Sequence, residues 1–267
     1  MQGVDHMISA SRARLFGLGC SILALFLMPA ADAHADRGLS IQSVLALCEA
    51  ENDVVQALWT RKIVGPGLKV GLAFSADWRE PGVDAGPLPA GFLQGTSEQL
   101  AGTSVGIGLY QGSDYPLRAE NRFGGVELAA FQRIKSVSEP QYFFAPDTSL
   151  YTAMFPSIAV AEPCVTCHND DPNSPKRDWQ LDDVMGATTW TYPAKTVAAG
   201  DLVSIIKTLR EAVRSNYATY VDKVSTFASP PEIGARWPED GYYLPSVDVF
   251  MDAVDQMIPT LDSLSLQ

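Results

Sequence analysis

One pentapeptide constrains this chain more than any other feature: residues 164–168 read Cys-Val-Thr-Cys-His, a C-x-x-C-H sequence. Two thiols three residues apart, followed at once by an imidazole, form the attachment pattern of c-type haem. In that chemistry the thiols bond to the two vinyl groups of the porphyrin, and the adjacent histidine binds the iron from one face. The pattern predicts one covalent haem c, anchored by Cys164 and Cys167, with His168 as the proximal iron ligand.

The first 35 residues have the layout of a secretory signal peptide. Arg12 and Arg14 precede the uncharged apolar run 15–28, and small residues stand at the predicted cleavage site. The run is shorter than the roughly 20 residues that cross a bilayer as a helix. We therefore expect cleavage near Ala35 and a periplasmic protein without a membrane span. A retained N-terminal anchor and lipidation of Cys20 are the alternatives.

Other interpretations of the two cysteines stay open. A structural zinc site needs four nitrogen or sulfur ligands, which is as many as the chain keeps after residue 35. A thioredoxin-like dithiol lies on a turn between a strand and a helix, whereas Pro163 and the run 169–172 indicate a loop here. A plain disulfide between Cys164 and Cys167 is the third alternative.

Cleavage near residue 35 leaves His168 as the only histidine and Cys48 as the only cysteine outside the motif. Two histidines therefore cannot bind one haem within this chain, and the sixth iron ligand has to be another residue type. The candidates are Cys48, a lysine, a tyrosine, and the methionines Met154, Met185, Met251 and Met257.

The helical pattern over residues 41–62 places Cys48. Apolar residues recur there at helical spacing, at Ile41, Val44, Leu45, Val55, Leu58 and Trp59. Cys48 falls on the same face, so its thiol is predicted to point into the core. On this pattern alone, a buried cysteine is more often a small hydrophobic side chain than an iron ligand.

Apolar segments between glycines and prolines predict the strands of an antiparallel sheet. These segments are 68–74, 104–110, 141–145, 150–161 and 186–192. A helix is expected over 125–136, so the fold class is α+β.

The pattern changes beyond Pro193. Asp201 can cap a helix whose apolar stripe runs to Val224, and a short helix is expected over 246–258. We expect these two helices to pack against the sheet or to pair with a second subunit in a homodimer.

Composition excludes several classes of protein. The chain has 31 Asp and Glu against 19 Lys and Arg, a net charge of −12, which argues against nucleic acid as its main partner. With 46% hydrophobic residues it can build one core of ordinary size, which argues against disorder. No second histidine remains to act as a distal base, so an enzyme such as a peroxidase is not expected.

Three segments resemble a family of single-haem c proteins built on a PAS-like domain. The family, long labelled a domain of unknown function, includes soluble exported cyanobacterial proteins and extracytoplasmic input domains of bacterial signalling proteins. Residues 161–168 are similar to its attachment segment, and residues 182–193 to its closing strand. The turn 115–118 and the helix with Glu127 and Phe131 correspond more loosely to a turn of the family.

This resemblance covers roughly residues 40–195 and implies a PAS-like antiparallel sheet flanked by helices, with an N-terminal helix and a C-terminal helical extension. The corresponding domains are a signal peptide over 1–35, a haem c-binding domain over 36–195 and the extension over 196–267. Some members donate a cysteine from the N-terminal helix as the distal ligand, which implies that role for Cys48.

A haem held by His168 and Cys48 suits redox or gas sensing. A thiolate stabilises ferric iron and lowers its reduction potential, and its loss on reduction opens the iron to a diatomic such as NO or CO. We therefore expect an exported sensing or binding protein whose partner is a diatomic ligand or a redox protein.

The alternative is a periplasmic electron-transfer cytochrome c with a methionine such as Met154 or Met185 as sixth ligand. In either case Lys176 and Arg177 are candidate donors to the haem propionates; the alternative is that both are solvated residues of a loop.

Overall fold

The computed structural model describes residues 38–160 and 162–258. The signal peptide predicted over 1–35 lies outside the described residues. Within the described part of the chain, no helix is long and apolar enough to cross a membrane. The described residues form one compact unit.

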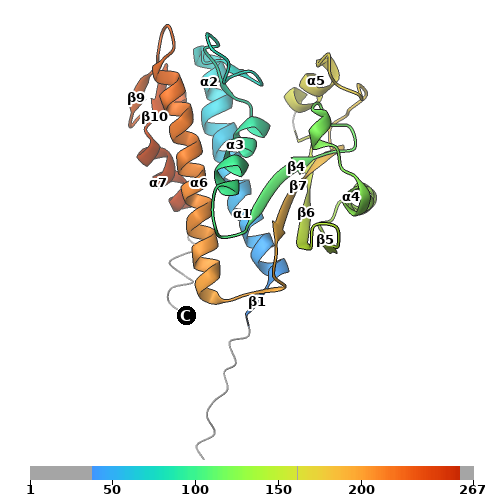
Figure 1. Ribbon diagram of the computed structural model, residues 1–267. Helices are drawn as coiled ribbons and strands as arrows, with labels where there is room; N and C mark the ends of the chain where they lie inside the picture. The colour runs from blue at the N-terminus through green and yellow to red at the C-terminus, as the bar shows by residue number, and fades with distance from the viewer. Residues whose placement is uncertain (1–37, 161, 259–267) are drawn as a thin grey trace, which may run out of the picture. The chain divides into compact units, whose positions relative to one another are not determined.

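The helices are α1 (Ile41–Leu58), α2 (Gly65–Val70), α3 (Pro89–Ala101), α4 (Gly125–Val137), α5 (Glu162–Asp170), α6 (Ala199–Ser225) and α7 (Val247–Met257) (Figure 1). A π-helical segment, η1 (Trp59–Val64), joins α1 to α2, and two 3-10 turns are η2 (Ala119–Asn121) and η3 (Pro238–Asp240). The strands are β1 (Leu39–Ser40), β2 (Phe74–Ser75), β3 (Gly86–Pro87), β4 (Gly108–Gly112), β5 (Gln141–Ala145), β6 (Leu150–Ile158), β7 (Val184–Tyr192), β8 (Thr196–Val197), β9 (Glu232–Gly234) and β10 (Tyr243–Pro245).

A four-stranded antiparallel sheet in the order β4-β7-β6-β5 is the frame of the fold. Its register aligns Leu109, Trp190 and Ala153 across three strands, and all three belong to the core that α1 covers. Because side chains alternate between the faces of a sheet, Met154 and Ala187 belong to a second core under α4. The expected α+β class, an antiparallel sheet flanked by helices, is confirmed (Figure 1).

In the part of the chain that the structure describes, the remaining strands form three two-stranded ladders. β1 pairs with β8 in antiparallel orientation, whereas β2 with β3 and β9 with β10 are parallel pairs. None of the three joins the four-stranded sheet.

The helix predicted over 41–62 is confirmed and runs further than expected. Ser40 caps α1, since its Oγ accepts from the N–H of Ser43 at 3.2 Å. From Trp59 the chain becomes π-helical and continues as α2 to Val70. The strand predicted over 68–74 is therefore wrong, because Gly71, left-handed at φ 99°, ends a helix rather than separating strands.

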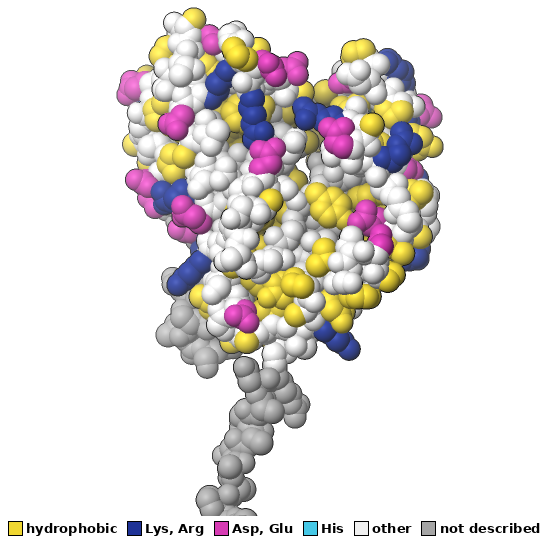
Figure 2. Space-filling view, in the orientation of Figure 1, with side chains coloured by type: hydrophobic (Ala, Val, Ile, Leu, Met, Phe, Trp, Pro, Cys, Tyr) yellow, Lys and Arg dark blue, Asp and Glu magenta, His cyan; other side chains and the backbone are white. Residues whose placement is uncertain are grey.

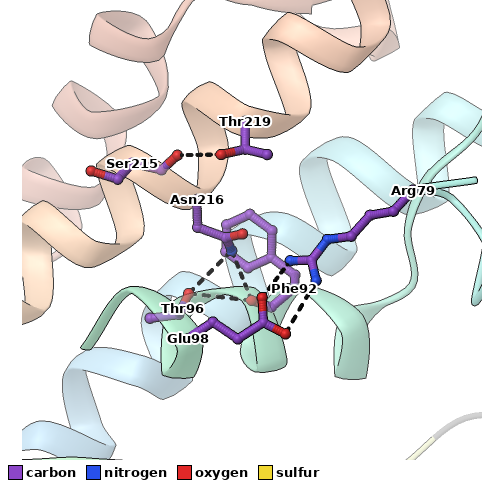
Figure 3. Close-up of polar contacts among 7 residues, drawn as sticks. All are labelled: Arg79, Phe92, Thr96, Glu98, Ser215, Asn216 and Thr219. Carbon is purple, nitrogen blue, oxygen red and sulfur yellow. Dashed lines mark hydrogen bonds and ion pairs between the residues drawn. The ribbon is translucent and has the colours of Figure 1, made fainter. Parts of the chain in front are cut away.

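Helix α3 is an element that the sequence does not predict, because Gly91 and Gly95 weaken its helical pattern. Gly95 is needed where α3 meets α6: an added Cβ would lie 2.0 Å from Oδ1 of Asn216. The Nδ2 of Asn216 donates to the carbonyl of Phe92 at 2.8 Å and to Oγ1 of Thr96 at 3.2 Å (Figure 3). Tertiary contact thus overrides local propensity here.

The remaining expectations need small corrections. The strand predicted over 104–110 begins only at Gly108, as β4. Asp201 is not the cap of α6; the N-cap is Ala198, and Asp201 lies in the first turn, where a carboxylate favours the helix dipole. The elements expected over 125–136, 141–145, 150–161, 186–192 and 246–258 are present as α4, β5, β6, β7 and α7.

The C-terminal helices share a core with α1. Tyr217 of α6 and Phe250 of α7 stack at a centroid distance of 4.0 Å, and both belong to the buried cluster that holds Cys48 and Trp190. Helix α6 lies against α3, α1 and α7. The domain boundary expected at residue 195 and the homodimer through these helices stay predictions.

A buried ion pair joins α1 to α6. Arg210 donates to both carboxylate oxygens of Glu51 at 2.9 Å, and the Glu51 side chain is only 1% exposed. The same guanidinium reaches Asp255 at 3.1 Å and the carbonyl of Ile258 at 3.3 Å. One arginine therefore holds α1, α6 and the end of α7 together.

Glu49 is a buried carboxyl group on the side of α1 that faces the sheet. The indole N–H of Trp190 donates to Oε2 of Glu49 at 2.6 Å, and both side chains are buried. Burial raises the pKa of Glu49 to about 8, although the Trp190 hydrogen bond opposes part of the shift. The carboxyl is therefore largely protonated at neutral pH.

Removal of Arg210 should leave the buried carboxylate of Glu51 without its cationic partner. We expect Arg210→Ala to lower the free energy of unfolding by about 3–5 kcal/mol, measured by urea denaturation. The matched control is Arg214→Ala, which removes a pair to Asp248, a side chain that is 83% exposed. That control should cost roughly 0–1 kcal/mol, and equal losses in the two variants would contradict the assignment.

Glu49 should make stability depend on pH. The folded protein holds a proton that the unfolded chain releases, so the free energy of unfolding should fall as pH rises from about 4.5 to about 8. We expect Glu49→Gln to remove this slope and to gain about 4–5 kcal/mol relative to the wild type at pH 8.5. Urea denaturation across pH tests this, with Glu98→Gln, which removes an exposed carboxylate, as the control that keeps the slope.

Candidate functional site

Helix α5 carries the C-x-x-C-H motif directly after β6, where a loop is expected from the sequence. Pro163 lies in the first turn of this helix, where backbone N–H groups have no partner within the helix. The missing N–H of proline therefore costs no hydrogen bond. Residues three and four positions apart share one face of a helix. Cys164, Cys167 and His168 therefore lie on one side of α5.

The two motif cysteines are free thiols. Cys164 is half-buried and Cys167 is exposed. Burial, with smaller contributions from Asp171, Cys164 and Asp170, raises the pKa of the Cys167 thiol. A redox-active dithiol needs a lowered thiol pKa, so the thioredoxin-like interpretation is not favoured. Among the described residues, no group of three or more His, Cys, Asp or Glu is placed to hold a metal ion.

The imidazole of His168 has the properties of an iron ligand. Its Nδ1 atom is buried, and neither ring nitrogen has a hydrogen-bond partner within the described residues. Burial lowers its pKa, against a smaller opposing effect of Asp171, so the ring is neutral, which is the form that binds a metal. The donor set of two thiols and one free imidazole fits a covalently attached haem.

Apolar side chains flank the motif without polypeptide cover. Ile158 is 38% exposed, Val160 is 79% exposed and Leu181 is 44% exposed. The amide of Asp182 donates to the carbonyl of Ala159 at 3.0 Å, which holds Leu181 beside the end of β6. Exposed apolar groups gathered in one place mark a binding surface, and a porphyrin is a large apolar ligand.

The loop that leads from α5 to β7 is fixed to α5 by one side chain. Asn169 Oδ1 accepts from the N–H of Trp179 at 2.9 Å, and its Nδ2 donates to the carbonyl of Trp179 at 3.0 Å. Arg177 donates to the carbonyls of Asn169 and Pro172, so it closes the C-terminal end of the helix. This arginine, a candidate propionate donor, thus has a structural role. Lys176 pairs with the exposed Asp178 and lies over the ring of Trp179.

The structure does not bring Cys48 together with α5. Cys48 is fully buried in the core of α1, and α5 contributes no described residue to that core. Figure 1 shows α1 along one face of the sheet and α5 at its end. Burial, then Glu51 and Glu49, raise the pKa of the Cys48 thiol far above its ordinary value.

The four methionines considered as sixth ligands differ in position. Met154 is buried under α4, Met251 is buried on α7, and Met257 is 52% exposed at the end of α7. Met185 is half-buried and has no partner on β6, because Ser157 pairs with Gly186 and Ile158 with Val184. This bulge lies at the end of the sheet from which α5 extends, so Met185 is the methionine best placed toward the motif.

A second apolar area lies at the other end of the sheet. Tyr142 is 37% exposed and Phe144 is 48% exposed, and both line a cavity of about 280 Å³ with Ile41, Leu45 and Tyr151. Figure 2 shows hydrophobic side chains in the lower part of the face drawn, where α1 begins, whereas acidic and basic side chains are interspersed elsewhere. No motif residue lines this cavity.

Sequence reasoning missed Asn169 and Trp179 as parts of the site. Their contact joins residues ten positions apart through side chain and backbone, which no periodicity reveals. The one available signal is a tryptophan within the largely polar stretch 169–180.

Comparison with known proteins identifies the family to which the chain belongs. A family model described as Tll0287-like matches residues 39–193, more than half of the chain. No curated protein and no solved structure matches the chain. The matched region runs from β1 through β7 and so includes the whole four-stranded sheet and the motif helix. The chain belongs to the Tll0287-like family, a family of single-haem c domains.

Proposed function

We propose that the chain carries one haem c, bound through thioethers at Cys164 and Cys167, with His168 as its proximal iron ligand. The observation that carries this proposal is the face of α5, where two free thiols lie beside a neutral imidazole without a hydrogen-bond partner. The family match supports haem binding. When bound, the haem supplies an iron that changes redox state and can take a diatomic ligand.

The biological role that we propose is redox or diatomic-gas sensing in the periplasm, with Cys48 as the distal ligand. The resemblance of α1 to the cysteine-bearing helix of the family supports it. In the described structure the Cys48 thiol is buried away from α5. Ligation therefore requires a second position for this side chain, and two positions of one thiol provide the two states that a switch needs.

The second candidate is electron transfer with Met185 as the sixth ligand. Its support is the position of Met185 in the bulge of β7, at the end of the sheet where α5 lies. A methionine ligand raises the reduction potential, which suits an electron carrier. We propose no enzymatic activity, since His168 is the only described histidine.

Covalent attachment should depend on both motif thiols. We expect the protein, produced with a bacterial haem-attachment system, to give one haem per chain by pyridine haemochrome and a haem-stained band on a denaturing gel. Cys164→Ala combined with Cys167→Ala should lose the stained band, because no thioether can form. Cys48→Ala is the matched control and should keep it; a stained band in the double variant would refute covalent attachment at α5.

The identity of the sixth ligand should be visible in spectra of the ferric protein. We expect a low-spin thiolate signal in low-temperature EPR that disappears in Cys48→Ala and persists in Met185→Leu. If the signal survives in Cys48→Ala, the thiolate assignment is wrong. A methionine–sulfur absorption band in the ferric protein, lost in Met185→Leu, would establish the electron-carrier candidate instead.

A further inference from the structure

The imidazole of His168 has one ring nitrogen enclosed by the protein. This atom, Nδ1, is buried and has no hydrogen-bond partner among the described residues. When Nε2 of a histidine binds a metal, Nδ1 carries the proton and becomes a donor. A metal-bound histidine almost always donates that N–H to a carboxylate, a backbone carbonyl or a water. His168 as an iron ligand therefore needs an acceptor close to Nδ1.

Asp171 brings a carboxylate to within one helical turn of His168. The N–H of Asp171 donates to the carbonyl of Cys167 at 3.0 Å, which continues the helical hydrogen-bond pattern past the last residue of α5. Residues three and four positions apart on a helix have Cβ atoms about 5–6 Å apart. Because side chains lean toward the N-terminal end of a helix, the carboxylate of Asp171 leans toward His168 and Cys167.

The electrostatics of the motif agree with this placement. After burial, the charge of Asp171 has the next largest effect on the pKa of both neighbours. It adds to the rise in the pKa of Cys167 and opposes the fall in the pKa of His168. The same carboxylate thus acts on an attachment thiol and on the imidazole.

A turn holds the Asp171 carboxylate and engages only one of its oxygens. Oδ1 accepts from the N–H of Asn173 at 2.7 Å, and the carbonyl of Asp171 accepts from the N–H of Ser174 at 3.0 Å. Within the described part of the chain, Oδ2 has no hydrogen bond and no ion pair. The carboxylate is therefore an acceptor that is already held in place and has one oxygen to offer.

The neighbouring polar side chains are less suited to this role. Oδ1 of Asn169 already accepts from the N–H of Trp179 at 2.9 Å. Asp170 is exposed, and it lies two positions after His168, whereas neighbours on one helix face are three or four positions apart. Among these groups, Asp171 is the acceptor on the side of His168.

The end of the helix is also a place where a carboxylate needs a donor. The helix dipole puts a partial negative charge at the C-terminal end of α5, so the charge of Asp171 is unfavourable there unless a positive group or an N–H faces it. The N–H of Asn173 is one such donor. The N–H of an iron-bound His168 is a second.

We propose that Asp171 is the positioning residue of the proximal ligand: its Oδ2 accepts a hydrogen bond from Nδ1 of His168 when Nε2 binds the haem iron. The inference rests on the proposed function, since it concerns the iron ligand of the same haem. The described structure does not contain this bond, so side-chain rotation makes it when the iron binds. A carboxylate acceptor fixes the ring and strengthens its donation to iron, which lowers the reduction potential in the same direction as a distal thiolate.

The test uses the haem-loaded protein and needs no activity. The Fe–His stretching band of its resonance Raman spectrum is recorded in the ferrous state directly after photodissociation of CO, when the iron has no sixth ligand. We expect Asp171→Asn to move this band to lower frequency and to raise the reduction potential. Asparagine keeps the turn to Asn173 through its Oδ1, but it puts an NH₂ group in the place of Oδ2.

Two further variants separate the hydrogen bond from a general effect of charge. Asp171→Glu keeps a carboxylate and should give a band closer to that of the wild type than Asp171→Asn does. Asp170→Asn is the matched control, because it removes the same charge from the adjacent, exposed position, and it should leave the band unchanged. Equal shifts in Asp170→Asn and Asp171→Asn, or an unmoved band in Asp171→Asn, would overturn the inference.

The inference and the proposed function fail in different ways. A protein that carries no covalent haem after production with the attachment system overturns both. A haem-loaded protein whose Fe–His band does not respond to Asp171→Asn overturns only the role of Asp171, and His168 remains the proximal ligand.

Discussion

Burial of α1 between the sheet and the C-terminal helices imposes two polar requirements on the chain, one on each side. Toward the sheet, Glu49 is buried and meets the indole N–H of Trp190 on β7. Toward the C-terminal helices, Glu51 is buried and meets the guanidinium of Arg210 on α6. A charged or polar group can be buried only with such partners. The register of β7 and the rotation of α6 about its axis are therefore both tied to one short stretch of α1.

This arrangement leaves α5 outside the main core. The sheet contributes one face to the core of α1 and the other to the smaller core under α4, and α5 extends from the end of β6. The exposed apolar side chains of Ile158, Val160 and Leu181 lie near it.

The elements that sequence reasoning predicted well have strong local signals. Helix α1 and strands β5, β6 and β7 were predicted correctly, because burial of one face imposes a regular spacing of apolar residues. Two of the errors lie at glycines. Gly95 permits contact with Asn216 and so conceals α3, and Gly71 ends α2 where a strand was expected. The residues proposed to attach the haem could be named from the C-x-x-C-H motif alone, because that chemistry requires particular residue types at a particular spacing. The distal side has no such signal, since the position of a thiol relative to a cofactor depends on packing between distant segments.

Helix α5 has one further consequence, because it lies within the connection between β6 and β7. These strands pair along their length as neighbours in the sheet, and the connection is closed at its base by the hydrogen bonds of Ala159 with Asp182 and Asp183. The sheet is therefore complete without the segment that bears the motif, which is an insertion in a hairpin. Such an insertion can change its sequence, and with it the chemistry of the attachment site, while the strand pairing that supports it stays the same.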